Sequence, residues 1–323
     1  MPYDVFNGDA DGICALHQLR LANPRDSELV TGVKRDIKLL GQLSGVRDSA
    51  ITVLDISMDA NKVNLLELLS QNNTIQYFDH HFAGEIPSIL SLDAHIDLSP
   101  DVCTSILVDR YLRGKYRSWA VVAAFGDNLH PSARKLAAAI EMSPVQIAQL
   151  CELGELINYN SYGETLNDLH FSPVILYEAL HSYEDPFEFY HSSQALAGLK
   201  EGYADDMEKA NSCLPLRENS TGVIYRFPAE SWGKRAAGVF CNLIARKEPD
   251  IAHALLVDNG DDSYLVSVRS PLSRMEGADL LCREFETGGG RKAAAGINRL
   301  PDKEITRFFE RFDTIFSCSE HPN

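Results

Sequence analysis

The sequence lacks the features of a membrane-spanning, secreted or disulfide-bonded protein. No apolar run approaches the roughly 20 residues that a membrane helix needs. Residues 1–12 show no basic start followed by an apolar core, so no secretory signal is predicted and a cytoplasmic location is expected. The cysteines are odd in number and never spaced as CxxC, which disfavours a disulfide framework and a structural zinc site. We expect reduced thiols that largely fill the core: Cys14, Cys103, Cys151, Cys213, Cys241, Cys282 and Cys318.

The chain also has few basic residues. It carries 30 Lys and Arg against 46 Asp and Glu, a formal net charge of -16. Proteins bind long nucleic acids mainly by neutralising phosphates with cationic side chains. Long duplex DNA is therefore not an expected partner, although one or two phosphates can still be bound locally, and the lack of an apolar span leaves no membrane partner expected. Whether the chain forms a homodimer stays open.

Length and pattern predict a two-domain α/β protein. The 323 residues, 45% of them hydrophobic, suffice for two cores. Strands alternate with helices at first, a mostly helical region follows, and strands return near residue 222. The prediction is a larger parallel-sheet α/β domain at 1–185, a connecting helix or linker at 186–219, and a smaller α/β, glycine-rich domain at 220–323, with a cleft between the domains.

Several predicted elements of the first domain end in carboxylates. Strands at 3–6, 51–54 and 74–78 are followed by Asp9 and Asp11, by Asp55, and by Asp79-His80-His81. In a parallel sheet such ends lie along one edge, where α/β proteins bind their ligands. Asp127 follows an apolar helix, where a cap or turn is the alternative role.

The carboxylates predict a metal site. Asp9 and Asp11 lie two residues apart in a loop, and like charges held close together repel strongly unless a cation lies between them. Oxygen-rich sites with one or two imidazole nitrogens suit Mn²⁺ or Mg²⁺. A pair of such ions polarises a phosphoryl oxygen and activates water. A structural cluster around Asp79-His80-His81 is the alternative.

These motifs resemble the DHH phosphoesterase superfamily. The resemblance rests on the segment 7–12 (NGDADG), Asp55, Asp79-His80-His81 and Gly126-Asp127, in the superfamily's order. The segment 288–296 (GGGRKAAAG) is similar to the signature of its DHH-associated C-terminal domain. The resemblance covers nearly the whole chain. The superfamily includes RecJ-like exonucleases, nanoRNase-like enzymes and cyclic dinucleotide phosphodiesterases.

The resemblance implies a site for one or two Mn²⁺ ions, with Mg²⁺ as the alternative. Asp79 would orient a histidine, and His81 would face the substrate phosphate. The chain departs from the superfamily at Asn7, where many members have a His that binds the same ion as Asp9. That ion is therefore expected to bind more loosely, with water, or only with substrate. The implied metal ligands are Asn7, Asp9, Asp11, Asp55, His80 and Asp127.

Substrate-binding residues are expected in both domains. Thr104 and Ser105 lie in the first turn of a predicted helix, whose N-terminus attracts anions. The glycines Gly288, Gly289 and Gly290 would let backbone N–H groups approach a phosphate, with Arg291 beside them. A flexible turn before an Ala-rich helix is the alternative. Arg269 and Ser270 would clamp the distal nucleotide, and an exposed strand end is the alternative for Arg269.

The resulting hypothesis is a Mn²⁺-dependent enzyme that hydrolyses phosphodiester bonds of short oligonucleotides or linear dinucleotides, with attack by a hydroxide generated at the metal. The alternatives are a phosphomonoesterase acting on phosphoadenosine phosphate and a single-strand exonuclease. A nucleotide-binding sensor with a degenerate metal site is the non-enzymatic alternative.

Overall fold

The computed structural model describes residues 1–317 and divides them into two compact units. The first unit comprises residues 1–202 and the second begins at Tyr203, so the division falls inside helix α9 (Gln194–Ser212). Cys318 and the rest of the predicted second domain beyond 317 lie outside the described residues. Each unit has its own sheet and its own core.

The first unit is built on a parallel five-stranded sheet with the order β2-β1-β3-β4-β5. Its elements are β1 (Tyr3–Phe6), α1 (Ala10–Ala22), β2 (Glu28–Val30), β3 (Ala50–Leu54), α2 (Lys62–Ser70), β4 (Thr74–Asp79), β5 (Leu92–Ile96), α3 (Thr104–Tyr111), α4 (Arg117–Gly126), α5 (His130–Ala138), α6 (Pro144–Asn160), α7 (Pro173–His181) and α8 (Pro186–Ser192).

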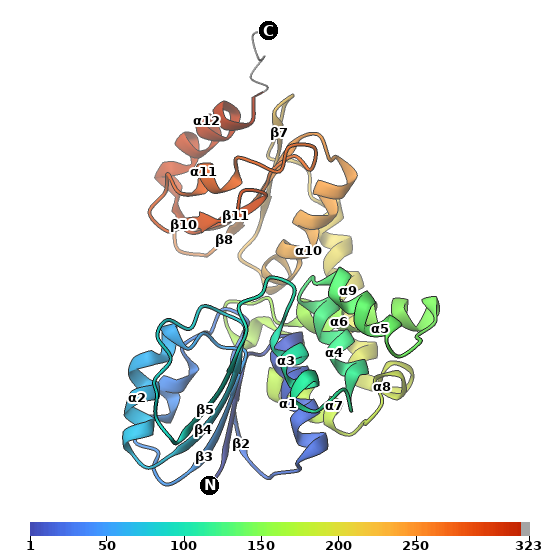
Figure 1. Ribbon diagram of the computed structural model, residues 1–323. Coiled ribbons are helices and arrows are strands. Elements are labelled where there is room, and N and C mark those ends of the chain that lie inside the picture. The colour runs from blue at the N-terminus through green and yellow to red at the C-terminus, as the bar shows by residue number, and fades with distance from the viewer. Residues whose placement is uncertain (318–323) are drawn as a thin grey trace. The chain divides into compact units, whose positions relative to one another are not determined.

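Helices cover both faces of this sheet. Figure 1 shows α2 on one face and α1 and α3 on the other. On the α2 side, Val5, Val53 and Tyr77 point from three neighbouring strands toward Leu65 and Leu68. Because side chains alternate along a strand, the residue after each of these points to the opposite face. Chain connections diverge at β1, which lies between β2 and β3, and such a point is where open α/β sheets bind ligands.

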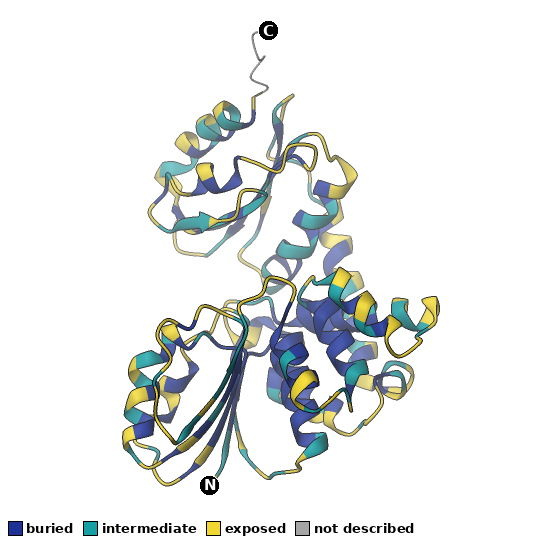
Figure 2. Cartoon of the chain, viewed as in Figure 1, coloured by how far each residue is buried: buried dark blue, intermediate teal, exposed yellow. Residues whose placement is uncertain are grey.

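Helix α1 lies in the interior of the first unit. Its residues from Ala10 to Arg20 are all buried, and Figure 2 shows α4 buried along most of its length as well. Asp9 is the N-cap of α1, and its carboxylate accepts hydrogen bonds from the backbone N–H groups of Asp11 (3.0 Å) and Gly12 (3.1 Å). Gly12 has no room for a side chain, because a Cβ there would lie 2.1 Å from the Asn7 carbonyl oxygen. The loop carrying the first acidic residues is therefore held rigidly.

The side chain of His17, in α1, is buried against α4 and the end of α7. Its ring meets Trp119 edge-on at 4.6 Å between centroids. Nε2 lies 3.0 Å from the Tyr183 carbonyl oxygen, and Nδ1 lies 3.3 Å from Nδ1 of His181. Burial, together with His181, lowers the pKa of His17 to about 3. The imidazole is therefore neutral in the folded protein at neutral pH.

We expect His17 to make the protein less stable in mild acid. Its pKa is lower folded than unfolded, so the stability it contributes is complete above about pH 6.5 and falls as pH drops toward 3. Relative to His17→Gln, which does not titrate, the free energy of unfolding should fall by about 2 kcal/mol between pH 7 and pH 5. Urea melts of both proteins at the two pH values measure this, and parallel pH profiles would contradict it.

The second unit contains a mixed six-stranded sheet with the order β10-β11-β9-β8-β7-β6. Strands β7 and β8 are parallel and the other pairs are antiparallel. Its elements after α9 are β6 (Arg217–Glu218), β7 (Gly222–Phe227), α10 (Ser231–Lys247), β8 (Ala252–Asp258), β9 (Ser263–Arg269), α11 (Ala278–Cys282), β10 (Gly288–Gly290), β11 (Ala294–Pro301) and α12 (Ile305–Phe316).

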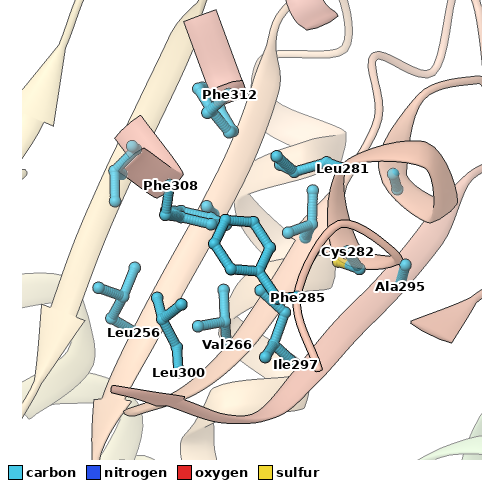
Figure 3. Close-up of a cluster of buried hydrophobic side chains, with 14 of the residues drawn as sticks. Leu256, Val266, Leu281, Cys282, Phe285, Ala295, Ile297, Leu300, Phe308 and Phe312 are labelled. Atoms are coloured by element: carbon cyan, nitrogen blue, oxygen red, sulfur yellow. The ribbon is translucent and has the colours of Figure 1, made fainter. Parts of the chain in front are cut away.

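Alternate residues of β8 supply two separate cores. Leu256 points toward α11 and α12, where Figure 3 shows Phe308, Phe312 and Leu281 packed over the sheet. Leu255, its neighbour, points toward α10 on the opposite face. Burying both faces of a sheet requires an apolar residue at successive positions, which explains the continuous run in β8.

The glycine-rich segment forms a hairpin. Gly288, Gly289 and Gly290 are strand β10, which pairs antiparallel with β11. A Cβ on Gly288 would lie 1.7 Å from the Cys282 carbonyl oxygen, and Gly290 has φ +140, so close approach and backbone conformation both require glycine. Residues from 294 onward are a strand, so the alternative of an Ala-rich helix is wrong.

The other differences from expectation are local. Strand β5 was not expected, because Asp93 and His95 interrupt any apolar run. Helix α3 begins at Thr104, so Thr104 and Ser105 do lie in its first turn. Cys14, Cys103, Cys241 and Cys282 are buried free thiols, as predicted, whereas Cys151 and Cys213 are partly exposed. Among residues 1–317, no helix combines the length and apolar character needed to cross a membrane.

Candidate metal centre

The acidic residues predicted to meet at the sheet edge do so. The backbone leaves β1 through Asp9 into α1, β3 ends before Asp55, β4 ends at Asp79, and α4 ends before Asp127. Ligand atoms of Asp11, His80 and Asp127 lie within 4.8 Å of one another, as do those of Asp55, His80 and His81. His80 links the two groups, with Nε2 3.5 Å from Asp55 Oδ1 and 3.9 Å from Asp127 Oδ2.

Asp11 is fixed by the N-terminus of α3. Its carboxylate accepts hydrogen bonds at 2.7 Å from the backbone N–H groups of both Thr104 and Ser105. The Ser105 hydroxyl donates to the Asp11 carbonyl oxygen (2.9 Å), and the Thr104 hydroxyl donates to Asp55 Oδ1 (3.1 Å). The helix N-terminus does hold an anion, as its dipole favours, but that anion belongs to the protein.

The expectation that Thr104 and Ser105 contact substrate therefore needs correction. Both residues are fully buried, and their N–H groups are already used by Asp11. The structure instead gives them a positioning role, because they orient two of the clustered carboxylates. Each Asp11 oxygen accepts one backbone hydrogen bond and keeps a lone pair for a cation.

Asp55 lies at the centre of the negative charge. It is buried, and burial together with repulsion from Asp11, Asp9 and Asp127 raises its pKa well above the usual range. Burial and the charge of Asp11 likewise raise the pKa of Asp127 to about 6. These shifts have two physical causes: the carboxyl groups are buried, and several of them share a small volume without enough positive charge. A cation bound among them would remove the repulsion.

Asp79 and His81 form a separate hydrogen-bonded pair. The Asp79 carboxyl is fully buried, and its Oδ1 lies 2.7 Å from Nδ1 of His81, whose side chain is 46% exposed. Although burial lowers the pKa of His81, its bond to Asp79 outweighs that effect and raises the pKa overall. Asp79 Oδ2 is buried and has no hydrogen-bond partner among residues 1–317. Asp79 is thus paired with His81, the residue expected to face the substrate phosphate.

The other half of the cluster contains a lysine. Lys34 Nζ lies 2.5 Å from Asp9 Oδ2, 3.0 Å from Asn158 Oδ1 and 3.7 Å from Asp127 Oδ1. Burial raises the pKa of Asp9, but the Lys34 ammonium and hydrogen bonds reverse the effect and hold that pKa below its usual value. Asn7 is buried beside this pair, and its side-chain amide donates to the Lys34 carbonyl oxygen (3.1 Å).

The two halves differ in their fit to a metal ion. One half supplies three carboxylates and one imidazole, from Asp11, Asp55, Asp127 and His80. Among the described residues, the one Lys or Arg within 4 Å of these carboxylates in an ion pair is Lys34, which approaches Asp127. This donor set suits Mn²⁺ or Mg²⁺. On the Asn7 side, the carboxylate of Asp9 already has a cationic partner. The side with Asp55 and His80 therefore fits a divalent ion, whereas the side with Asn7 and Asp9 does not.

In the second unit, Ser270 is tied into the fold. It is buried, its hydroxyl donates to the Lys292 carbonyl oxygen (2.8 Å) and accepts from the Ala278 N–H (3.0 Å). It therefore joins β9 to the glycine hairpin and to the start of α11, and its hydroxyl is not available to clamp a nucleotide. This corrects the expected substrate contact at Ser270.

Arg269 and Arg291 remain available for an anion. Arg269 Nε donates to the Asn242 side chain (2.9 Å), and Nη1 donates to the Val268 carbonyl oxygen (3.1 Å). Arg291 is exposed at the tip of the β10–β11 hairpin. Neither forms an ion pair with a carboxylate within residues 1–317. The predicted nest of free glycine N–H groups is replaced by a paired edge strand, so a phosphate there would rely mainly on these guanidinium groups.

Lys34 and Asn158 are the site residues that sequence reasoning missed. Lys34 follows strand β2, the shortest strand of the first sheet, and Asn158 lies near the end of α6. A signal existed for Lys34: it comes shortly after the apolar residues Leu29 and Val30 of β2, and the ends of parallel strands share one edge. Asn158 offered none, because an asparagine near a helix C-terminus is most often a local capping residue.

The fold defined by these two units is that of several phosphoesterases. No protein-family model matches the chain, and no curated protein matches it in sequence. Among solved structures, an exonuclease RecJ bound to manganese is 16% identical, with a TM-score of 0.59, over 98% of this chain and 90% of that one. A pGpG-specific phosphodiesterase, PggH from Vibrio cholerae, is 13% identical, with a TM-score of 0.59, over 97% and 98%.

A further RecJ, from Thermus thermophilus and in complex with Mn²⁺, is 16% identical, with a TM-score of 0.57; the matched region covers 97% of this chain and 51% of that longer one. At these identities the likeness shows the fold. The two-region α/β fold that length and pattern predict is thereby confirmed, with a parallel sheet followed by a mixed one.

Proposed function

We propose that this chain is a metal-dependent phosphoesterase that hydrolyses phosphodiester bonds of short oligonucleotides or linear dinucleotides, with Mn²⁺ as its ion. The observation that carries the proposal is the cluster of Asp11, Asp55, His80 and Asp127 at the carboxyl edge of the parallel sheet. The shared fold supports it, since the neighbours include a manganese-bound exonuclease and a dinucleotide phosphodiesterase.

The first-unit cluster would hold the cation through Asp11, Asp55, His80 and Asp127. When bound, a divalent ion polarises a phosphoryl oxygen and lowers the pKa of water. The protein itself holds these ligands in place before the ion arrives: Thr104 and Ser105 fix Asp11, and Thr104 also fixes Asp55. Such positioning is worth most when the ligand groups need not reorganise during the reaction.

His81 would act on the substrate. Asp79 binds Nδ1 of the ring, so Nε2 remains for a phosphoryl or leaving-group oxygen. Because its pKa is raised, His81 holds a second proton over a wider pH range than an ordinary histidine. It can donate that proton from Nε2 as negative charge develops on the leaving oxygen.

A small substrate fits the charge of the chain better than a polymer does. The net charge of -16 opposes a long polyanion, while Arg269 and Arg291 offer two guanidinium groups for a terminal phosphate. RecJ in the structural comparison is named an exonuclease, so a single-strand exonuclease is the second candidate.

The deciding experiment is a substrate screen in Mn²⁺ with product chromatography. Linear dinucleotides, three- to five-nucleotide RNAs, a long single strand and phosphoadenosine phosphate are compared at equal phosphate concentration. We expect mononucleotides from the short substrates, no turnover after EDTA treatment, and recovery on adding Mn²⁺. Preference for the long strand would favour the exonuclease, and preference for phosphoadenosine phosphate the phosphomonoesterase. Absence of turnover on every substrate would favour a nucleotide sensor.

A further inference from the structure

Asn7 does not face the cluster as a ligand. Its Oδ1 accepts a hydrogen bond from the Asp9 backbone N–H (3.2 Å), and its Nδ2 donates to the Lys34 carbonyl oxygen (3.1 Å). Both ends of the amide are thus engaged by backbone groups, and the side chain is only 4% exposed. Asn7 joins the first acidic loop to the segment that carries Lys34.

The backbone of Lys34 is held from a second side. Its N–H donates to the carbonyl oxygen of Ser161 (3.2 Å), just beyond α6. With the bond from Asn7, this fixes where the Lys34 side chain starts. The backbone of Lys34 is therefore held on both sides, while its side chain is 31% exposed.

The Lys34 ammonium has the surroundings of a bound cation. It contacts carboxylate oxygens of Asp9 at 2.5 Å and Asp127 at 3.7 Å, the amide oxygen of Asn158 at 3.0 Å, and the ring of Tyr162 at 5.8 Å. An ammonium held this close to a carboxylate keeps its positive charge across the neutral pH range.

The charge balance of the cluster is uneven as a result. Asp9 has the Lys34 ammonium 2.5 Å away, whereas Asp55 has no ion pair with a lysine or arginine among the described residues and only approaches His80 Nε2 at 3.5 Å. Positive charge is thus already supplied on the Asp9 side and is still lacking on the side of Asp55 and His80. One further cation would satisfy the cluster, and a second divalent ion next to Asp9 would have to displace the ammonium.

We propose that Lys34 takes the place of one metal ion, so that the site binds a single divalent cation per chain, held on the side of Asp11, Asp55, His80 and Asp127. This inference rests on the proposed function for the existence of that centre. It assigns Lys34 as a built-in cation and Asn7 as the residue that positions it. A compact ammonium supplies charge and hydrogen-bond donors but does not activate water, so that task falls to the single ion.

The test counts bound Mn²⁺ by equilibrium dialysis with elemental analysis, and uses electron paramagnetic resonance to detect coupling between neighbouring ions. We expect one Mn²⁺ per wild-type chain and an uncoupled spectrum. The double variant Asn7→His with Lys34→Ala, which replaces the lysine charge with an imidazole ligand, should bind a second ion and show a coupled spectrum. Lys34→Arg, which keeps the charge, should still bind one.

The matched control is Lys38→Met, which removes an exposed lysine of the same segment. It should bind one ion, as the wild type does, and circular dichroism should confirm that every variant is folded. Two ions per wild-type chain would overturn the inference, as would a folded double variant that still binds one. A wild-type chain that binds no Mn²⁺ overturns the proposed function itself, whereas one bound ion without turnover rejects only the proposed reaction.

Discussion

Replacing Asp55 by asparagine is expected to lower the rate of phosphodiester hydrolysis roughly 10²- to 10³-fold while leaving the protein folded. Asp55 lies among the other carboxylates of the cluster. Its Oδ1 accepts a hydrogen bond from the Thr104 hydroxyl (3.1 Å) and lies 3.5 Å from His80 Nε2. Asparagine keeps the size and one oxygen but removes the negative charge that a divalent ion requires. The measurement is kcat for a linear dinucleotide at saturating Mn²⁺.

Asparagine is also the substitution that the backbone tolerates best. Asp55 has φ +60, a left-handed conformation that Asn and Asp adopt more readily than other residues with side chains. Asp48, which is exposed and has φ +49, provides a matched control. Asp48→Asn makes the same chemical change in a similar backbone and should leave kcat unchanged. A folded Asp55→Asn protein with near-normal turnover would show that the Asp55 carboxylate is not a ligand of the proposed metal centre.

The largest expected loss of stability comes from Asp4→Ala. Asp4 lies in β1 and is 1% exposed, and its carboxylate receives Arg20 Nη2 and Arg25 Nη2, each at 2.5 Å, and Arg20 Nε at 2.7 Å. Alanine would leave the buried Arg20 guanidinium with the Thr52 hydroxyl but without an anion. Breaking a buried ion pair from one side costs about 3–5 kcal/mol, because the remaining charge stays desolvated.

Urea denaturation at pH 7 measures this loss. Asp26→Ala serves as the control, because Asp26 is exposed and lies in the same region of sequence as Arg25. It should change the free energy of unfolding by less than about 0.5 kcal/mol. A loss as small for Asp4→Ala would show that water reaches Arg20 and that the pair is not desolvated.

The parts of the site that sequence reasoning predicted are those tied to regular structure. Asp9, Asp55 and Asp79 follow strands whose apolar runs are readable in the sequence, and parallel pairing then brings their ends together. Lys34 escaped prediction because only three residues of strand precede its loop, and its role depends on a side-chain contact across the fold.

Roles were harder to predict than positions. Ser270 was placed correctly at the end of a strand, but a hydroxyl there can bind either a ligand or the protein's own backbone, and only packing decides between them. The three glycines of β10 carry no side-chain pattern, so nothing in their sequence separates a strand from a loop.

The hydrogen bonds to Asp11 bear on how the acidic site behaves when no metal is bound. Two backbone N–H groups donate to this carboxylate, the Lys34 ammonium contacts Asp9, and burial raises the pKa of Asp127 to about 6. Asp9 and Asp11 thus have partners within the protein without a bound ion, whereas Asp55 has only the neutral Thr104 hydroxyl. If the proposed ion binds here, its removal and return should leave the positions of Asp9 and Asp11 unchanged.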